Sequence, residues 1–175
     1  GNLEATDNTL DLAIQGKGFF QVLLPDGTTA YSRDGTFQLN GTGLMVTHDG
    51  YQVQPGITIP SNAIDVTINN SGEVQVKIEG QTALSTVGQL QIATFLNDAG
   101  LEAIGDNLYK ETPASGAATT GNPASTGFGS ILQGFLETSN VNAVEEISNL
   151  ISAQRAYEMN SKVIQTSDEM LGTLT

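Results

Sequence analysis

Turns built around Asp-Gly or Asn-Gly pairs constrain this chain more than any other feature. Four of them fall within residues 25–50, at 25–27, 33–35, 40–43 and 48–50. Such pairs are strong hairpin signals, because the favoured two-residue turns need φ > 0. Short runs rich in β-branched and aromatic residues flank them: LDLAI (10–14), GFFQVLL (18–24), TTAYS (28–32), TFQL (36–39), LMVT (44–47) and YQVQ (51–54). The pattern predicts an antiparallel meander.

The following segment alternates between apolar and polar residues on both sides of a second turn, NNSG at 69–72. The apolar positions are Ile64, Val66, Ile68, Val74, Val76 and Ile78. Because side chains alternate between the two faces of a strand, this spacing predicts a hairpin with one buried face. A run VGQLQIATF (87–95) and a turn NDAG (97–100) follow. We therefore expect residues 1–111 to form one β-rich domain.

Residues 112–138 have a different composition. The stretch 112–130 contains no charged residue and almost no large apolar one. Such a stretch buries too little surface to offset the entropy of ordering it. We expect 112–138 to be an uncharged linker or loop between the strands and the C-terminal segment.

Residues 139–175 predict a single long helix. Asn142 is the expected N-cap, and Glu145 three residues later completes a capping box. No Pro or Gly occurs from Val141 to Leu171. The predicted fold class is therefore mainly β: an antiparallel β-hairpin-rich domain followed by a long C-terminal α-helix.

Apolar residues of the predicted helix recur every seven positions and form a thin stripe. The expected contact residues are Leu150, Ala153, Tyr157, Ile164, Leu171 and Leu174. Asn160 and Ser167 lie in the same stripe, so it supplies little hydrophobic energy. Because most helix stability comes from packing an apolar face, we expect this helix to pack with other helices, from a missing part of the chain or from other copies. Packing against its own β domain is the second interpretation.

The charge balance excludes several classes of partner. Six basic and nineteen acidic side chains give a formal charge of −13. Nucleic acid is not an expected partner, because binding it requires clustered Lys and Arg, and an anionic membrane surface is disfavoured for the same reason. No run approaches the roughly 18 apolar residues of a membrane span. The N-terminus lacks the basic start and apolar run of a cleaved signal peptide, and its abrupt beginning suggests a fragment of a longer protein.

No catalytic, cofactor or metal site is predicted. The chain has no cysteine and one histidine, His48, which is adjacent to Asp49 in a turn. Neighbouring turn residues rarely face each other, so a polar turn histidine is the simpler interpretation. Gly16-Lys17-Gly18 lacks the spacing and the Ser or Thr of a phosphate-binding loop. We expect neither a cofactor, a small-molecule substrate nor enzymatic activity.

Several segments resemble the bacterial flagellar rod and hook family of axial proteins. GNLEATDNTLDLAIQGKGFFQV and AYSRDGTFQLNGTGLMVTHDGYQVQP are similar to the start and the hairpins of that family's β domain. LETSNVNAVEEISNLISAQRAYEMNSKVIQTSDEML is similar to its C-terminal signature. Within the family, VGQLQIATFLNDAGLEAIGDNLY (87–109) and the Glu-x-Asn-Ser-Lys ending at Lys162 resemble the members that form the distal rod.

The resemblance implies a structural role. Family members polymerise helically into the hollow driveshaft that carries torque from motor to hook, with terminal helices as an inner tube and the β domain outside. It implies self-association into a helical homopolymer, and contacts with proximal rod proteins, hook subunits and the ring proteins around the rod. It also implies type III export without a cleaved signal peptide, and a place in the periplasm-spanning basal body of the flagellum. Residues 112–138 would then return the chain to the axis.

One departure and three alternatives accompany this resemblance. Family members begin with a further N-terminal segment carrying a partner helix, and this chain starts after it. A hook or proximal-rod subunit of the same family is the nearest alternative. A secreted β-rich fibre or adhesin module is ranked behind it, and an enzyme such as a peptidoglycan hydrolase last.

Overall fold

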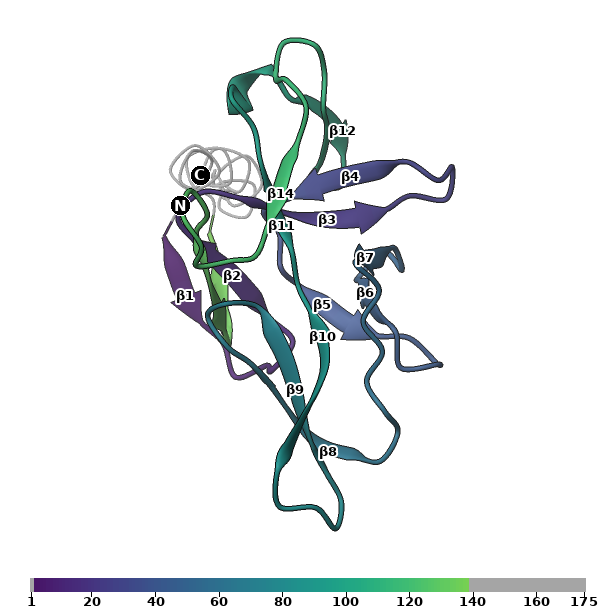
Figure 1. The fold of residues 1–175 in the computed structure, drawn as a ribbon. Helices are drawn as coiled ribbons and strands as arrows, with labels where there is room; N and C mark the ends of the chain where they lie inside the picture. The colour runs from purple at the N-terminus through teal and green to yellow at the C-terminus, as the bar shows by residue number, and fades with distance from the viewer. Residues whose placement is uncertain (1, 139–175) are drawn as a thin grey trace, which may run out of the picture. The chain divides into compact units, whose positions relative to one another are not determined.

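The computed structural model describes residues 2–138 of the chain (Figure 1). Contacts divide the chain into two compact units, and the larger one spans Leu3–Glu137. This unit, called the body from here on, is built from sixteen β-strands and one short 3-10 turn, η1 (Asp98–Gly100). The turns at 25–27, 33–35, 40–43 and 48–50 follow one another closely, so the strands between them are short.

The largest sheet of the body has nine strands. Its main path runs in the order β12-β13-β4-β3-β7-β6-β5, and β11 pairs with both β3 and β14. The strands are β3 (Phe19–Leu23), β4 (Thr29–Ser32), β5 (Phe37–Leu39), β6 (Met45–Thr47), β7 (Gln52–Gln54), β11 (Ile92–Thr94), β12 (Glu102–Gly105), β13 (Leu108–Lys110) and β14 (Thr119–Gly121). The predicted turns at 25–27, 40–43 and 48–50 do join paired strands here.

A three-stranded sheet, which we call the arm, extends from the body. It consists of β8 (Ala63–Ile68), β9 (Glu73–Ile78) and β10 (Leu84–Gln89) in the order β10-β9-β8. The predicted hairpin at 69–72 is present, because β8 and β9 pair antiparallel and Ile68 faces Val74. The Asn69 side chain stabilises the turn, since its Oδ1 accepts the amides of Ser71 and Glu73.

Two further strand pairs join distant parts of the chain. β2 (Leu12–Gln15) pairs with β15 (Ser130–Gln133), and β1 (Leu3–Ala5) pairs with β16 (Phe135–Glu137). Figure 1 shows these strands together at one side of the body, away from the β3–β4 hairpin. The two ends of the body are therefore held next to each other.

The main hydrophobic core is shared by the large sheet, the arm and the β2–β15 pair. Its fully buried members include Leu12, Phe20, Ile57, Val74 and Ile131. A second cluster, around Phe19, Tyr31 and Phe95, packs its rings edge to face at centroid distances of 4.9 and 5.7 Å. Because the main cluster crosses all three sheet systems, the arm is part of the same core and not a separate domain.

The predicted fold class is wrong in its helical part. The chain is mainly β, and residues 2–138 contain no α-helix, only η1. The predicted helix falls on residues 139–175, which lie outside the described residues. The prediction depended on a capping box at Asn142 and Glu145 and on the absence of Pro and Gly, and such local signals specify a helix weakly because packing provides most helix stability.

Residues 112–138 also differ from the predicted uncharged loop. They contain β14, β15 and β16, and their Ser115 is completely buried. The small and polar residues of this segment gain backbone partners on β11, β2 and β1, which lie far away in the sequence. Composition alone does not reveal such pairing, because backbone hydrogen bonds stabilise a strand irrespective of its side chains.

The Arg-Asp-Gly turn at 33–35 is a crossing between strands, not a hairpin. It leads from β4 to β5, and these two strands are not neighbours in the sheet. The Leu12 amide donates to the Gly35 carbonyl at 3.0 Å, so the turn presses against β2. A Cβ on residue 35 would lie 1.8 Å from the Leu12 carbonyl oxygen. Glycine is required here by close approach of two backbones.

Gly35→Ala should therefore destabilise the body strongly. We expect the free energy of unfolding to fall by about 3 kcal/mol, since backbone atoms cannot move aside as a flexible side chain can. Gly41→Ala is the matched control, because nothing lies within 4 Å of its Cβ position. Urea denaturation followed by circular dichroism measures both, and equal stabilities of the two variants would contradict the crossing.

Candidate interaction surfaces

No catalytic or metal centre emerges among the described residues. His48 Nε2 lies 3.6 Å from Asp49 Oδ1, and the His48 side chain is more than half exposed. Within residues 2–138, no group of three or more His, Asp and Glu side chains could hold a metal ion. None of the helical structure described there is long and apolar enough to cross a bilayer. The remaining candidates are the surfaces of the body and the hydrogen bonds that hold its parts together.

The pairing of β1 with β16 forms the first of these features, which we call the stem. Leu3 faces Glu137 and Ala5 faces Phe135. The Thr6 amide extends the pairing by donating to the Gly134 carbonyl at 2.7 Å. One residue beyond the strands, the Thr138 amide donates to the Asn2 carbonyl at 2.7 Å. Chain segments entering and leaving the body thus start from adjacent positions.

Arg33 ties the stem to the rest of the body. Its Nε donates to Glu137 Oε1 at 2.9 Å, and one terminal nitrogen donates to Glu137 Oε2 at 3.3 Å. The remaining donors bind the carbonyls of Ile14, Gly16 and Gly18 at 2.6 to 3.1 Å. A guanidinium has five donors in a fixed plane, so it can bridge a carboxylate and several carbonyls at once. This side chain joins β16 to the β2–β3 turn.

The same contact sets the ionisation of Glu137. Burial raises the pKa of this carboxyl, but hydrogen bonds and positive charge, led by those of Arg33, lower it by more. The pKa therefore lies below its ordinary value of 4.5. A carboxyl with a lowered pKa stabilises the fold when it is ionised, and this contribution disappears as the pH falls through the folded-state pKa.

Glu137→Gln should accordingly destabilise the body at neutral pH and have little effect in acid. We expect a loss of about 1 kcal/mol, less than the roughly 1.5–3 kcal/mol of a buried charged hydrogen bond, because the Arg33 side chain is 30% exposed to screening water. The difference in unfolding free energy between the variant and the unsubstituted chain should shrink as the pH falls below 4.5, the ordinary pKa of this carboxyl. Unfolding curves recorded across this pH range measure it.

Asp26→Asn provides the control for this pH series. Hydrogen bonds from Thr28 are the main cause that lowers the pKa of Asp26, and its partner Lys110 is 3.7 Å away on the surface. We expect a smaller change there at every pH. A Glu137→Gln effect that does not vary with pH would contradict an ionised contact with Arg33.

Gln133 joins the stem side of the body to the arm. Its Oε1 accepts the Ile68 amide at 3.1 Å, and its Nε2 donates to the Val66 carbonyl at 3.0 Å. Nε2 also donates to the Thr9 carbonyl at 2.8 Å. Because β8 is an edge of the arm, its outer backbone groups have no strand neighbour there. The side-chain amide of Gln133 takes the place of a neighbouring strand and fixes the arm against β15.

Gln133→Leu should loosen this junction. Leucine has a similar size but leaves three backbone groups without this partner: the Ile68 amide and the carbonyls of Val66 and Thr9. We expect a loss of about 3 kcal/mol, at roughly 1 kcal/mol per hydrogen bond. Gln91→Leu is the control, since the Gln91 side chain makes one exposed contact of 3.4 Å with Asn122. Hydrogen exchange of the Ile68 amide should accelerate in the first variant alone. An unchanged rate would contradict this role of Gln133.

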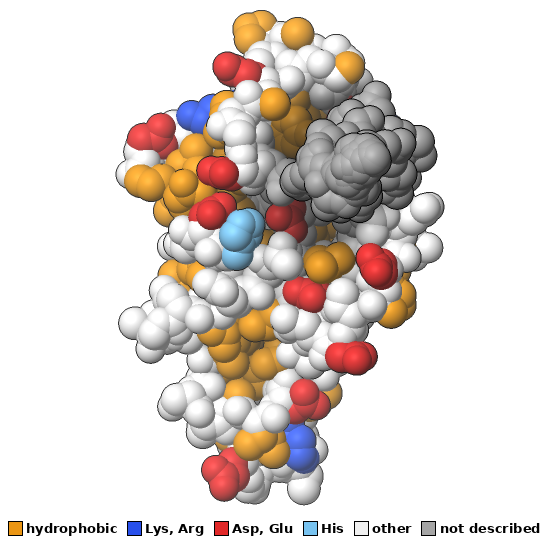
Figure 2. Space-filling model, turned by 180° about the vertical axis from the view of Figure 1, so that it is seen from behind, with side chains coloured by type: hydrophobic (Ala, Val, Ile, Leu, Met, Phe, Trp, Pro, Cys, Tyr) orange, Lys and Arg blue, Asp and Glu red, His pale blue; other side chains and the backbone are white. Residues whose placement is uncertain are grey.

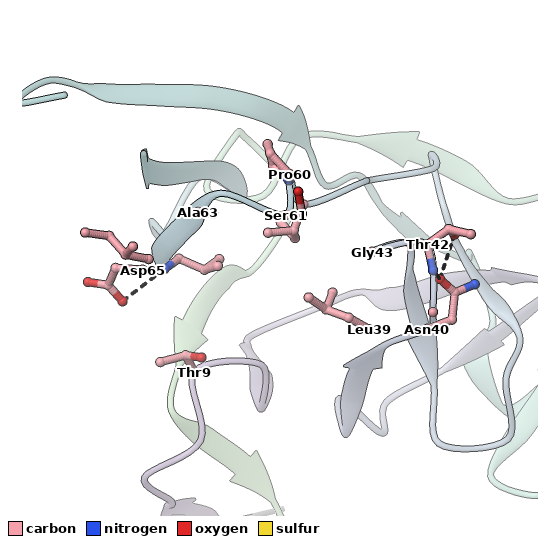
Figure 3. Close-up of a pocket in the computed structure, with 13 residues that line it drawn as sticks. Thr9, Leu39, Asn40, Thr42, Gly43, Pro60, Ser61, Ala63 and Asp65 are labelled. Carbon is pink, nitrogen blue, oxygen red and sulfur yellow. Dashed lines mark hydrogen bonds between the residues drawn. The ribbon is translucent and has the colours of Figure 1, made fainter. Parts of the chain in front are cut away.

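A groove of about 640 Å³ opens between the β5–β6 turn and the start of β8. Residues 39–43 form one wall, residues 59–61 and 63–66 form the other, and Thr9 also lines the groove. Figure 3 shows Leu39 near the middle, between Asp65 and Thr9 on one side and Asn40 and Thr42 on the other. The Ile59 amide donates to the Gly43 carbonyl at 2.8 Å, and a Cβ on residue 43 would lie 2.5 Å from the Ile59 carbonyl oxygen. The two walls are thus fixed to each other.

Two large hydrophobic side chains of this groove face water. Leu39 is 37% exposed and Ile64 is 59% exposed. The prediction that Ile64 shares the buried face of Val66 and Ile68 is wrong. The register of β8 shifts between Ala63 and Asp65, and this β-bulge turns Ile64 outward. Bulges often redirect a side chain toward a functional surface.

A further exposed hydrophobic side chain, Leu96, lies in the loop after β11. Leu96 is 98% exposed, although its neighbour Phe95 is buried in the aromatic cluster. Figure 1 places η1, which begins two residues after Leu96, at the opposite end of the body from β8. On the face drawn in Figure 2, acidic side chains are scattered between exposed hydrophobic ones and do not form one cluster. No single highly charged patch dominates that face.

The predicted contact residues of the C-terminal segment have no counterpart in this description. Leu150, Ala153, Tyr157, Ile164, Leu171 and Leu174 lie outside the described residues, as do the predicted capping residues Asn142 and Glu145. The sequence analysis did not identify Arg33 and Gln133, whose side chains link β16 and the arm to the rest of the body. Arg33 could have been noticed as a rare cation in a chain of charge −13, whereas nothing near Gln133 in the sequence distinguishes it.

Two family models match this chain. One, described as flagellar hook protein FlgE/F/G D1 domain, matches residues 13–76. The other, described as flagellar basal body rod FlgEFG protein C-terminal, matches residues 132–175. The first match covers most of the large sheet and part of the arm, and the second begins within β15.

Whole-chain comparisons find similar proteins in several bacteria. The flagellar basal-body rod protein FlgG of Caulobacter vibrioides is 63% identical over 171 residues, covering 98% of this chain and 65% of that protein. FlgG of Buchnera aphidicola is 53% identical over 175 residues, covering 100% of this chain and 67% of that protein. The flagellar hook protein FlgE of Salmonella typhimurium is 39% identical over 115 residues, covering 66% of this chain and 28% of that protein. The chain thus spans about two thirds of the length of the rod proteins it matches.

Proposed function

Because this chain belongs to the flagellar basal-body rod protein family, we propose that it is part of a structural subunit of the distal rod. The subunit self-assembles helically into the hollow driveshaft that transmits torque from the motor to the hook. Its action is mechanical and not enzymatic. The extent and degree of the similarity to rod proteins carry this proposal.

The rod is favoured over the hook by the comparisons. The similarity to FlgG extends over 98% to 100% of the chain at 53% to 63% identity in two bacteria. The similarity to a hook protein covers 66% of the chain at 39% identity. A hook subunit would be expected to show the reverse order.

The stem gives this proposal a physical basis. A body whose two ends leave side by side can be inserted between two terminal segments without separating them. The chain enters the body at β1 and leaves it at β16. Arg33 links β16 to the β2–β3 turn, and Gln133 links β15 to the arm. This arrangement suits a domain that must rotate together with an axis.

Partners and location form part of the same proposal. We infer that the subunit contacts copies of itself, proximal rod proteins, hook subunits and surrounding ring proteins, within the periplasm-spanning basal body. Export without a cleaved signal peptide belongs to the same inference. Leu150, Tyr157, Ile164 and Leu171 stay proposed inter-subunit contact residues, since they lie in the segment that matches the C-terminal family model.

A chimera tests the proposed function. This chain would replace the matching 171-residue part of FlgG in Caulobacter vibrioides, to which it is 63% identical. We expect motile cells with complete rods and hooks, because the replaced part keeps its own stem and body. Motility on soft agar and electron microscopy of basal bodies measure the outcome.

A second chimera supplies the control. Here the chain replaces the matching part of the hook protein FlgE, and we expect cells without functional hooks. A rod chimera that is exported and folded but yields no rods would overturn the proposal. A functional hook chimera together with a failed rod chimera would favour the hook alternative.

A further inference from the structure

We propose that Asn40 is a self-modifying site, at which the backbone amide of Gly41 displaces the side-chain amide of Asn40 and leaves a carboxylate in its place. The proposal goes beyond the function proposed above and does not depend on it. Asn40 is the only asparagine of the chain that precedes a glycine. Glycine matters because a residue without a Cβ leaves the attacking nitrogen unshielded and lets the backbone reach the geometry of attack.

The reaction uses water and no other reagent. The Gly41 nitrogen loses its proton and forms a bond to Cγ of Asn40, while the Cγ–Nδ2 bond breaks and Nδ2 leaves as ammonia. The product is a succinimide ring. Water then opens the ring at either of its two carbonyls, which gives aspartate or isoaspartate. The sum converts one asparagine and one water into one acidic residue and one ammonia, without any change of oxidation state.

Both nitrogens that take part are accessible. Asn40 and Gly41 are exposed, and within residues 2–138 no hydrogen bond involves the Gly41 amide or Nδ2 of Asn40. A Cβ on residue 41 would meet no atom within 4 Å, so the surroundings of the attacking group are open. Water and hydroxide therefore reach the proton that must leave, and ammonia departs directly into solvent.

The remaining atom of the reacting group, Oδ1 of Asn40, is held by three donors. The Thr42 amide donates to it at 3.0 Å and the Thr42 hydroxyl at 2.8 Å (Figure 3), and the Leu44 amide donates at 3.0 Å. Attack on Cγ places negative charge on this oxygen. Donors already aimed at the atom where charge develops lower the barrier, as they do in an oxyanion hole. The turn thus exposes the reacting atoms and stabilises the intermediate.

Asn69 provides a comparison within the same chain. Its Oδ1 also accepts three hydrogen bonds, from the amide and hydroxyl of Ser71 and from the Glu73 amide. The next residue, however, is Asn70, and a side chain beside the attacking nitrogen hinders attack. Nδ2 of Asn69 also donates to Glu73 Oε1 at 3.0 Å, so its leaving group is held. We therefore expect Asn69 to react much more slowly than Asn40.

Two other turns show that the aspartate product fits this conformation. Asp26 and Asp34 also precede glycines, and each accepts hydrogen bonds from the amide and the hydroxyl of a threonine two residues further on, Thr28 or Thr36. Asp26 itself resists the reaction. Hydrogen bonds from Thr28 lower the pKa of its carboxyl, and an ionised carboxylate is a poor electrophile. Conversion of Asn40 to aspartate therefore adds a negative charge without breaking the turn.

The isoaspartate product has a different consequence, because the chain then runs through the side chain of residue 40 and is one atom longer. The backbone hydrogen bond from the Asn40 amide to the Leu44 carbonyl, at 2.9 Å, spans this turn. Gly43 in the same turn accepts the Ile59 amide at 2.8 Å and so fixes the two walls of the groove. Hydrogen exchange of the Ile59 amide should accelerate in the separated isoaspartate form, and an unchanged rate would contradict this consequence.

Incubation of the purified chain in water labelled with a heavy oxygen isotope tests the proposal. Each conversion brings an oxygen of water into the residue, so peptide mass spectrometry identifies the site and excludes changes that preceded the incubation. We expect label at residue 40 to accumulate about tenfold faster than at Asn69 or any other asparagine of residues 2–138. Accumulation should be faster at mildly alkaline pH, because the Gly41 amide must lose its proton.

Three variants separate the nucleophile from the donors. Gly41→Ala meets no neighbour and needs no positive φ, and it should slow labelling at residue 40 about tenfold. Thr42→Val keeps the size of the side chain but removes one donor to Oδ1, and it should slow labelling about threefold. Asn70→Gly is the matched control: it should make residue 69 react faster and leave the rate at residue 40 unchanged.

Several outcomes would overturn the site. These are absence of label at residue 40, label spread evenly over the asparagines, and an unchanged or faster rate in Gly41→Ala or Thr42→Val. Because the experiment requires no rods, it is independent of the chimera. Motile rod chimeras combined with an unlabelled residue 40 would leave the proposed function in place and reject this site alone.

Discussion

The pairing of β1 with β16 is the constraint on which the rest of the body depends. It joins residues at opposite ends of a chain segment, Leu3 with Glu137, and closing a loop of this length costs about 4 kcal/mol in chain entropy. Three backbone pairs cannot offset that cost alone. The adjoining β2–β15 pair closes the same loop. Arg33 links Glu137 to the β2–β3 turn, and Gln133 donates to the Thr9 carbonyl, so both side chains act together with the stem.

These contacts also explain how a body of short strands is held together as one unit. Strands of three to six residues are weak individually, but the main core crosses the large sheet, the arm and the β2–β15 pair. Arg33 connects this core to the stem, and Gln133 connects it to the edge of β8. The core and these contacts thus join the large sheet, the arm and the stem into one body.

Local signals made part of this fold predictable. The turns at 25–27, 40–43, 48–50 and 69–72 contain their own Asp, Asn and Gly residues, so the hairpins they form could be identified from a few residues each. The pairing of Thr119–Gly121 with Ile92–Thr94 could not, because backbone bonds to a distant partner leave no pattern in the sequence. Ile64 was misplaced by a bulge that period-two alternation does not show. The roles of Arg33 and Gln133 arise from hydrogen-bond partners that only the folded chain brings together.

Hydrogen exchange at the Thr6 amide tests the central claim most directly. This amide donates to the Gly134 carbonyl, next to the β1–β16 pair, and it has no other role in the body. If the stem closes the body, its exchange should be slowed nearly as much as that of core amides such as Val22, because opening the stem also opens the β2–β15 side of the core. Exchange at the rate of an unfolded peptide, with Val22 fully protected, would show that the two ends of the body are not held together.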